Sequence, residues 1–172
     1  FVHANFKSHL LTLRAERTED TVASSGNLTN NAVRHKIVVL GAAKVGKSSL
    51  ITQFLYNTFS PKYKRTIEEM HHGDFNVAGV RLTLDILDTS GAYEFPAMRA
   101  LSMQSADAFI LVYDITDANS FAEVRSLRDQ IHETKESTAV PIVVVGNKVD
   151  LAETGERQVR MNTYLTFHVN AF

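Results

Sequence analysis

A glycine-rich segment in the first third of the chain carries residue types that bind phosphate. Residues 41–48 read GAAKVGKS, with Gly41 and Gly46 framing the loop and Lys47 and Ser48 closing it. Glycines let the backbone wrap closely around an anion, so that several N–H groups point at one phosphate. Lys47 is spaced to reach the β- and γ-phosphates of a nucleotide, and the Ser48 hydroxyl to ligate Mg²⁺. The predicted cradle comprises Gly41, Ala42, Ala43, Lys44, Val45, Gly46, Lys47, Ser48 and Ser49.

The sequence predicts a strand before this loop and a helix after it, and these elements would position the loop. Residues 37–40 form a short apolar run typical of a buried strand. After the loop, apolar residues recur at helical spacing at Leu50, Ile51, Phe54 and Leu55. A helix there would aim its N-terminal dipole at the phosphate. A chance match to the loop pattern is expected in on the order of one in two hundred chains of this length, but chance would not also supply the strand and the helix.

The rest of the central region alternates strand and helix patterns. Residues 80–88 alternate apolar and polar side chains, and residues 108–113 and 142–145 are apolar runs typical of buried parallel strands. Residues 120–123 read SFAE, a capping box that predicts a helix beginning there. Its apolar face would carry Phe121, Val124, Leu127 and Ile131. We expect an α/β fold with a mostly parallel sheet and helices on both faces.

A second motif indicates which base is bound. Residues 147–150 read NKVD, directly after the run 142–145, and resemble the guanine-recognition motif of GTPases. By this resemblance, Asp150 would accept two hydrogen bonds from the guanine edge, a donor pair that adenine lacks. Asn147 would tie this loop to the phosphate loop, and the stem of Lys148 would cover the base.

Two further segments extend the resemblance to a family. Residues 88–91 read DTSG, similar to the motif that opens the second switch of Ras proteins, and residues 63–69 read YKRTIEE, similar to their first switch. The order and spacing of all four motifs over residues 35–158 resemble a Ras-type small GTPase. Residues 84–91 followed by 95–99 are most similar to the Di-Ras and Rhes-like branches. The fold implied is the P-loop NTPase G domain.

The resemblance implies roles for five more residues. Thr66 would close over Mg²⁺ and the γ-phosphate, Asp88 would hold the metal, and the Gly91 N–H would contact the γ-phosphate. Phe59 would stack on the base and Tyr63 would lie over the phosphates. The implied function is a signal-transduction switch that binds GTP and GDP with Mg²⁺ and loosens both switch segments on losing the γ-phosphate. The implied metal ligands are Ser48, Thr66 and Asp88.

Two positions depart from the family in ways that concern hydrolysis. Ala92 stands where Ras proteins place a glutamine that orients the attacking water. Ala43 adds a methyl beside the γ-phosphate, where Ras has glycine. Both predict slow hydrolysis at a centre made of Lys47, Thr66, Gly91 and Ala92. Two alternatives remain, which are a nucleotide-loaded module that binds effectors without useful hydrolysis and a truncated isoform unable to hold nucleotide.

The ends of the chain fit the family less well than its middle. Residues 1–34 are polar and predict a mobile extension, 35–158 an incomplete G domain, and 159–172 a divergent tail. The last strand and helix of the family fold are expected to be missing. The cysteine-containing lipidation motif of many relatives is absent from this sequence, so we expect no membrane attachment to be encoded in it.

Composition bounds the partners. The chain has 172 residues, with 18 Lys plus Arg against 19 Asp plus Glu and no cysteine. This balance argues against a nucleic-acid-binding protein, and no apolar run is long enough to span a membrane.

The resemblance implies a monomer with protein effectors, an exchange factor and an activating protein. It also implies a cytoplasmic location, at the inner face of the plasma membrane as in relatives. Glu68 and Glu69 would either face basic effector surfaces or form a solvated acidic turn.

Overall fold

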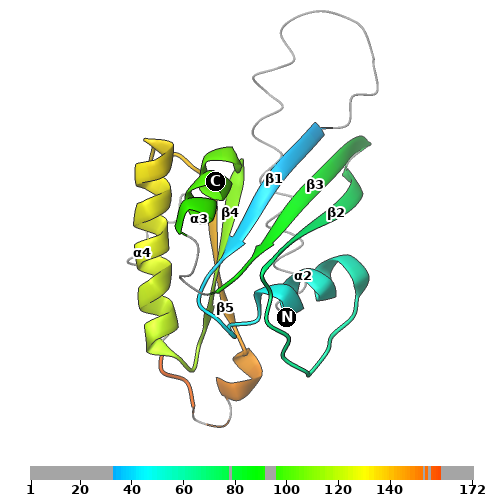
Figure 1. Ribbon diagram of the computed structural model, residues 1–172. Helices are drawn as coiled ribbons and strands as arrows, with labels where there is room; N and C mark the ends of the chain where they lie inside the picture. The colour runs from blue at the N-terminus through cyan, green and yellow to red at the C-terminus, as the bar shows by residue number, and fades with distance from the viewer. Residues whose placement is uncertain (1–32, 78, 92–95, 153, 155, 160–172) are drawn as a thin grey trace, which may run out of the picture.

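The computed structural model describes residues 33–77, 79–91, 96–152, 154 and 156–159. This part of the chain forms a five-stranded sheet of order β2-β3-β1-β4-β5 (Figure 1). The strands are β1 (Val33–Leu40), β2 (Glu68–Val77), β3 (Val80–Thr89), β4 (Ala108–Asp114) and β5 (Ile142–Asn147). Neighbouring strands run parallel except β2 with β3, which pair antiparallel. The prediction of a mostly parallel α/β sheet is confirmed.

Helices cover both faces of this sheet, as predicted. They are α2 (Lys47–Tyr56), α3 (Pro96–Ser105) and α4 (Ala118–Lys135), with a short 3-10 turn, η1, at Val149–Ala152. In Figure 1, α3 and α4 lie together on one side of the strands and α2 lies on the other. Alternate side chains of β1 pack on opposite faces of the sheet. Val38 packs in the apolar cluster that includes Leu127 of α4, and Val39 packs in the cluster that includes Ile51 of α2.

The start of α4 corrects the predicted capping box. The helix begins at Ala118, and Asp117 is its N-cap, accepting a hydrogen bond from the Asn119 N–H at 2.9 Å. Ser120 is therefore inside the first turn, buried, and its hydroxyl donates to the Asp117 carbonyl at 2.7 Å. The capping-box prediction is wrong because Asp117, three residues upstream of Ser120, is an equally good cap. The predicted apolar face, including Val124, is buried as expected.

The apolar pattern did not reveal β2 and α3. In β2 the residues between Glu68 and Val77 are mostly polar, and only Phe75 carries a large apolar side chain packed against the core around α2. In α3 only Ser102 and Met103 are buried. Both elements lie at the margin of the core, so little hydrophobic periodicity is required of them.

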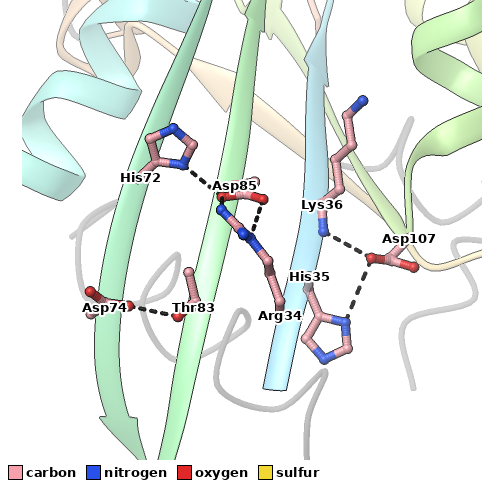
Figure 2. Close-up of polar contacts among 8 residues, drawn as sticks. All are labelled: Arg34, His35, Lys36, His72, Asp74, Thr83, Asp85 and Asp107. Carbon is pink, nitrogen blue, oxygen red and sulfur yellow. Dashed lines mark hydrogen bonds and ion pairs between the residues drawn. The ribbon is translucent and has the colours of Figure 1, made fainter. Parts of the chain in front are cut away.

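Polar contacts join β1, β3 and β2 on one face of the sheet (Figure 2). The Asp85 carboxylate of β3 accepts from Arg34 Nε at 2.6 Å and Nη2 at 3.0 Å, and lies 2.6 Å from His72 Nδ1 of β2. At the other side of β1, Asp107 accepts from the Lys36 N–H at 2.8 Å.

The sheet begins before the predicted domain start at residue 35, since β1 begins at Val33.

The described chain after η1 returns to the end of β4. The N–H groups of Gln158 and Val159 both donate to the Ile115 carbonyl, at 2.9 and 3.0 Å, and Val159 is buried. The predicted mobility of residues 1–32 and the divergent tail beyond Val159 lie outside the described residues. The same holds for the last strand and helix that we expected to be missing.

Candidate functional site

The loop between β1 and α2 has the backbone shape that its glycines permit. Gly41 has φ +143° and Gly46 φ +98°, conformations that side chains rarely adopt. A Cβ at Gly41 would lie 2.0 Å from the Val112 carbonyl oxygen, and one at Gly46 would lie 2.2 Å from Asn147 Nδ2. The loop therefore needs glycine twice, for conformation and for close contact with β4 and β5. Its ninth predicted residue, Ser49, lies in the first turn of α2.

Lys47 is buried at the base of this loop. Its side-chain nitrogen donates to the carbonyl oxygens of Gly41 and Ala42, both at 2.8 Å, and the residue is 6% exposed. Burial lowers the pKa of Lys47 to about 8, although the charges of Asp88 and Glu123 act in the opposite direction. A cation held inside a loop rich in N–H groups is suited to a multiply charged anion.

Three side-chain oxygens converge beside it. The hydroxyls of Ser48, in α2, and Thr66, just before β2, are 2.8 Å apart. Asp88, near the end of β3, is 1% exposed and hydrogen-bonds to Ser48. Burial raises the pKa of Asp88, opposed by the Ser48 hydrogen bond and the Lys47 charge.

This cluster fits Mg²⁺. Asp88 Oδ1 is buried without a hydrogen-bond partner among the described residues, a costly condition for a carboxylate oxygen. Mg²⁺ prefers oxygen ligands and is bound by one or two carboxylates together with substrate phosphates. Ser48, Thr66 and Asp88 therefore form a donor set of the right type.

The motif at residues 88–91 brings a fourth segment against the phosphate loop. A Cβ at Gly91 would lie 2.3 Å from the backbone nitrogen of Ala43 and 2.4 Å from its Cα. Only glycine allows this approach, and it places the Gly91 backbone beside the part of the loop that we expect to meet the γ-phosphate. Ala92, the next residue, lies outside the described residues.

The second motif lies at the other end of the same loop. Asn147 Nδ2 donates to the Val45 carbonyl at 2.8 Å, which ties the end of β5 to the phosphate loop as expected. Asp150 is exposed in η1. Lys148, between them, has φ +63° and forms an ion pair with Asp114 Oδ2 at 2.5 Å. Asp114 was not among the predicted site residues; its only sequence signal is a charged residue directly after a buried apolar run.

The two predicted aromatic residues lie in the segment between α2 and β2. Phe59 is 69% exposed and Tyr63 60% exposed, so both rings are accessible to a ligand. The Tyr63 ring centre is 5.7 Å from Lys44 Nζ, a cation–π distance that draws this segment toward the phosphate loop.

The segment that follows contributes an exposed surface. Ile67 is 72% exposed, and Glu68 and Glu69 are exposed at the start of β2 rather than in a turn. The Glu68 carboxylate accepts from the Ser102 hydroxyl of α3 at 3.3 Å. A shallow pocket lies between this strand and α3, lined in part by Ile67, Glu68 and Met98. Among the described residues, no helix is both long and apolar enough to cross a membrane.

Comparison with known proteins agrees with this arrangement. Residues 36–170 match the model of the Ras family. The chain is 45% identical over 141 residues to the GTP-binding protein Rhes of mouse, rat and human. These alignments cover 76% of this chain and 53% of each relative. The chain thus spans about half the length of the curated relatives that it matches.

Proposed function

Because this chain belongs to the Ras family, we propose that it binds GTP and GDP with Mg²⁺ and acts as a slowly hydrolysing signalling switch. The observation that carries the proposal is the convergence, at the carboxyl ends of the strands, of three features: a phosphate loop, a buried Asp88 oxygen without a partner among the described residues, and the base-recognition motif. The carboxyl ends of β1, β3 and β5 supply these groups, where open α/β sheets place their ligands.

The phosphate side of the site is assigned to five residues and to the backbone of the loop. Lys47 and the loop N–H groups bind the β- and γ-phosphates, and Ser48, Thr66 and Asp88 hold Mg²⁺. The metal, when bound, neutralises charge on the phosphate oxygens. The Gly91 N–H donates a hydrogen bond to the γ-phosphate, because the Gly91 backbone already lies against the loop at Ala43.

The base side is assigned to the segment after β5 and to the aromatic pair. Asp150 accepts hydrogen bonds from guanine N1 and the exocyclic amine, and Asn147 fixes its loop to Val45. Phe59 stacks on the base and Tyr63 lies over the phosphates. Both rings are exposed enough for a bound nucleotide to bury them.

Titration with fluorescent GDP tests the proposal. We expect saturable binding that requires Mg²⁺, is displaced by GTP and is not displaced by ATP. Weakened binding on chelation of Mg²⁺ would be due to the Ser48, Thr66 and Asp88 set. Absence of GDP binding by the folded chain would overturn the proposed function and would favour the alternative of a chain unable to hold nucleotide.

The affinity for nucleotide should depend on pH through Lys47. Phosphate binds the protonated ammonium, so affinity should be full below the pKa of about 8 and should fall as the pH rises through it. The decline can reach about tenfold per pH unit, because bound phosphate raises the pKa of Lys47. Fluorescent GDP titrations between about pH 7 and pH 9 measure this. Lys44→Met should keep the wild-type profile, and a flat wild-type profile would contradict the prediction.

Slow hydrolysis is proposed from Ala92 and Ala43. Introducing the missing amide with Ala92→Gln should raise the single-turnover rate of GTP hydrolysis by about a hundredfold, the lower end of the range for one positioned proton-transfer group. Ala97→Gln, on the exposed side of α3, is the matched control and should leave the rate unchanged. A wild-type hydrolysis rate equal to that of ordinary Ras proteins would contradict the prediction of slow hydrolysis.

A second candidate function is a nucleotide-loaded module that binds effectors without useful hydrolysis. The exposed methyl of Ala43, in the loop segment that Gly91 contacts, favours it. The expected partners are protein effectors meeting Ile67, Glu68 and Glu69, an exchange factor and an activating protein, with the chain itself monomeric. Tight GTP retention without turnover in the wild type and in Ala92→Gln would select this function.

A further inference from the structure

Asp114 is a buried carboxylate that has no role in the proposed function as described so far. It is the last residue of β4, is 7% exposed and pairs in register with Asn147 of β5. Its Oδ1 accepts from the Thr116 N–H at 2.9 Å and from the Thr116 hydroxyl at 2.7 Å. Its Oδ2 is 2.5 Å from Lys148 Nζ. One carboxylate thus joins the end of β4 to the base-recognition segment.

The position of Asp114 is fixed by groups that do not touch the expected nucleotide. Its N–H donates to the hydroxyl of Ser120 at 3.0 Å, and Ser120 is 1% exposed in the first turn of α4. Burial alone would raise the pKa of Asp114, but the hydrogen bonds of Lys148 and Thr116 outweigh burial and hold the pKa below its usual value. The carboxylate therefore stays charged and remains a firm anchor for a cation.

Lys148 needs such an anchor because its backbone is strained. Its φ of +63° is a left-handed conformation that residues with a Cβ rarely adopt. The residue before it, Asn147, is bound to the phosphate loop, and Asp150 follows in η1. The backbone turn at Lys148 thus sets the direction in which Asp150 leaves the sheet. Anchoring the ammonium at Asp114 also leaves only the aliphatic stem of Lys148 for the base.

We propose that Asp114 is a positioning residue for base recognition: by binding the Lys148 ammonium it holds the turn that aims Asp150 at guanine. This inference rests on the proposed function, since it concerns the same site. It predicts that losing the carboxylate charge damages discrimination between bases and leaves the phosphate side unchanged, because Lys47 and the loop are held by separate contacts.

The test compares Asp114→Asn with the wild type by titration with GDP, with inosine diphosphate and with tripolyphosphate. Inosine diphosphate lacks the exocyclic amine that Asp150 is expected to bind. We expect the preference for GDP over inosine diphosphate to fall about ten- to a hundredfold, the effect of one charge-assisted hydrogen bond. Tripolyphosphate affinity should stay unchanged, whereas a merely structural loss would weaken all three ligands together. Asp117→Asn, at the N-cap of α4, is the matched control.

Two further variants keep the test decisive if Asp114→Asn folds poorly. Thr116→Val removes one hydrogen bond to Oδ1 and keeps the charge, so it should lower the preference only about two- to fivefold. Combining Asp114→Asn with Lys148→Gln lets the two neutral side chains hydrogen-bond and should recover part of the preference lost in each single variant. An unchanged preference in a GDP-binding Asp114→Asn, or no effect of Thr116→Val when Asp114→Asn is unfolded, would overturn the inference alone. Failure of the wild type to bind GDP would overturn the proposed function and the inference together.

Discussion

Replacing Lys47 with methionine should lower GDP affinity by about a thousandfold, because two or more charge-assisted hydrogen bonds to phosphate are lost. The same change should not destabilise the nucleotide-free chain. Burial lowers the pKa of Lys47, so the folded protein carries a desolvated charge that methionine lacks. The variant should therefore separate binding from stability.

Two measurements check this result. Fluorescent GDP titration gives the loss of affinity, and urea unfolding without nucleotide gives the free energy of unfolding. Lys44→Met removes an exposed cation from the same loop and should change GDP affinity far less. If Lys47→Met unfolds more readily than the wild type, then its hydrogen bonds to Gly41 and Ala42 outweigh the cost of burial, and our account of this lysine is wrong.

The second large effect is expected at Asp150. Asp150→Ala removes the carboxylate that we propose accepts two hydrogen bonds from guanine, and should reduce the preference for GDP over ADP by about a hundredfold or more. Asp150 is exposed, so the substitution leaves no cavity and folding should be unaffected.

The ligand itself provides the control for this prediction. The wild type should bind inosine diphosphate more weakly than GDP, because the exocyclic amine is missing. Asp150→Ala should bind the two equally, since the partner of that amine is gone. If the variant still prefers GDP over inosine diphosphate, then another group recognises the amine and Asp150 is misassigned.

The parts of the fold that could be predicted are those specified locally. The loop at residues 41–48 and its flanking elements follow from glycine placement and a change of hydrophobic period over a short stretch. The elements β2 and α3 could not be predicted in this way, because they bury few side chains and so show little apolar periodicity. The cap of α4 was misplaced because Asp117 and Ser120 are both good capping residues.

The site residues likewise fall into those that a local motif predicts and those that depend on tertiary contacts. Residues in motifs, such as Lys47 and Asn147, could be singled out because their spacing is itself the signal. Asp114 could not, because its role depends on the β4–β5 register that brings it beside Asn147 and on the strained turn at Lys148. Pairing between strands 33 residues apart leaves no local pattern to read, since Asp114 alone looks like any charged residue after a strand.

The bond from Asn147 Nδ2 to the Val45 carbonyl joins residues 102 positions apart. A chain under synthesis cannot make it until β5 has emerged and docked on β4, so the phosphate loop reaches its final support only after most of the domain has been translated. On the proposed function, the chain would bind nucleotide only late in its synthesis, and the onset of GDP binding would coincide with the docking of β5.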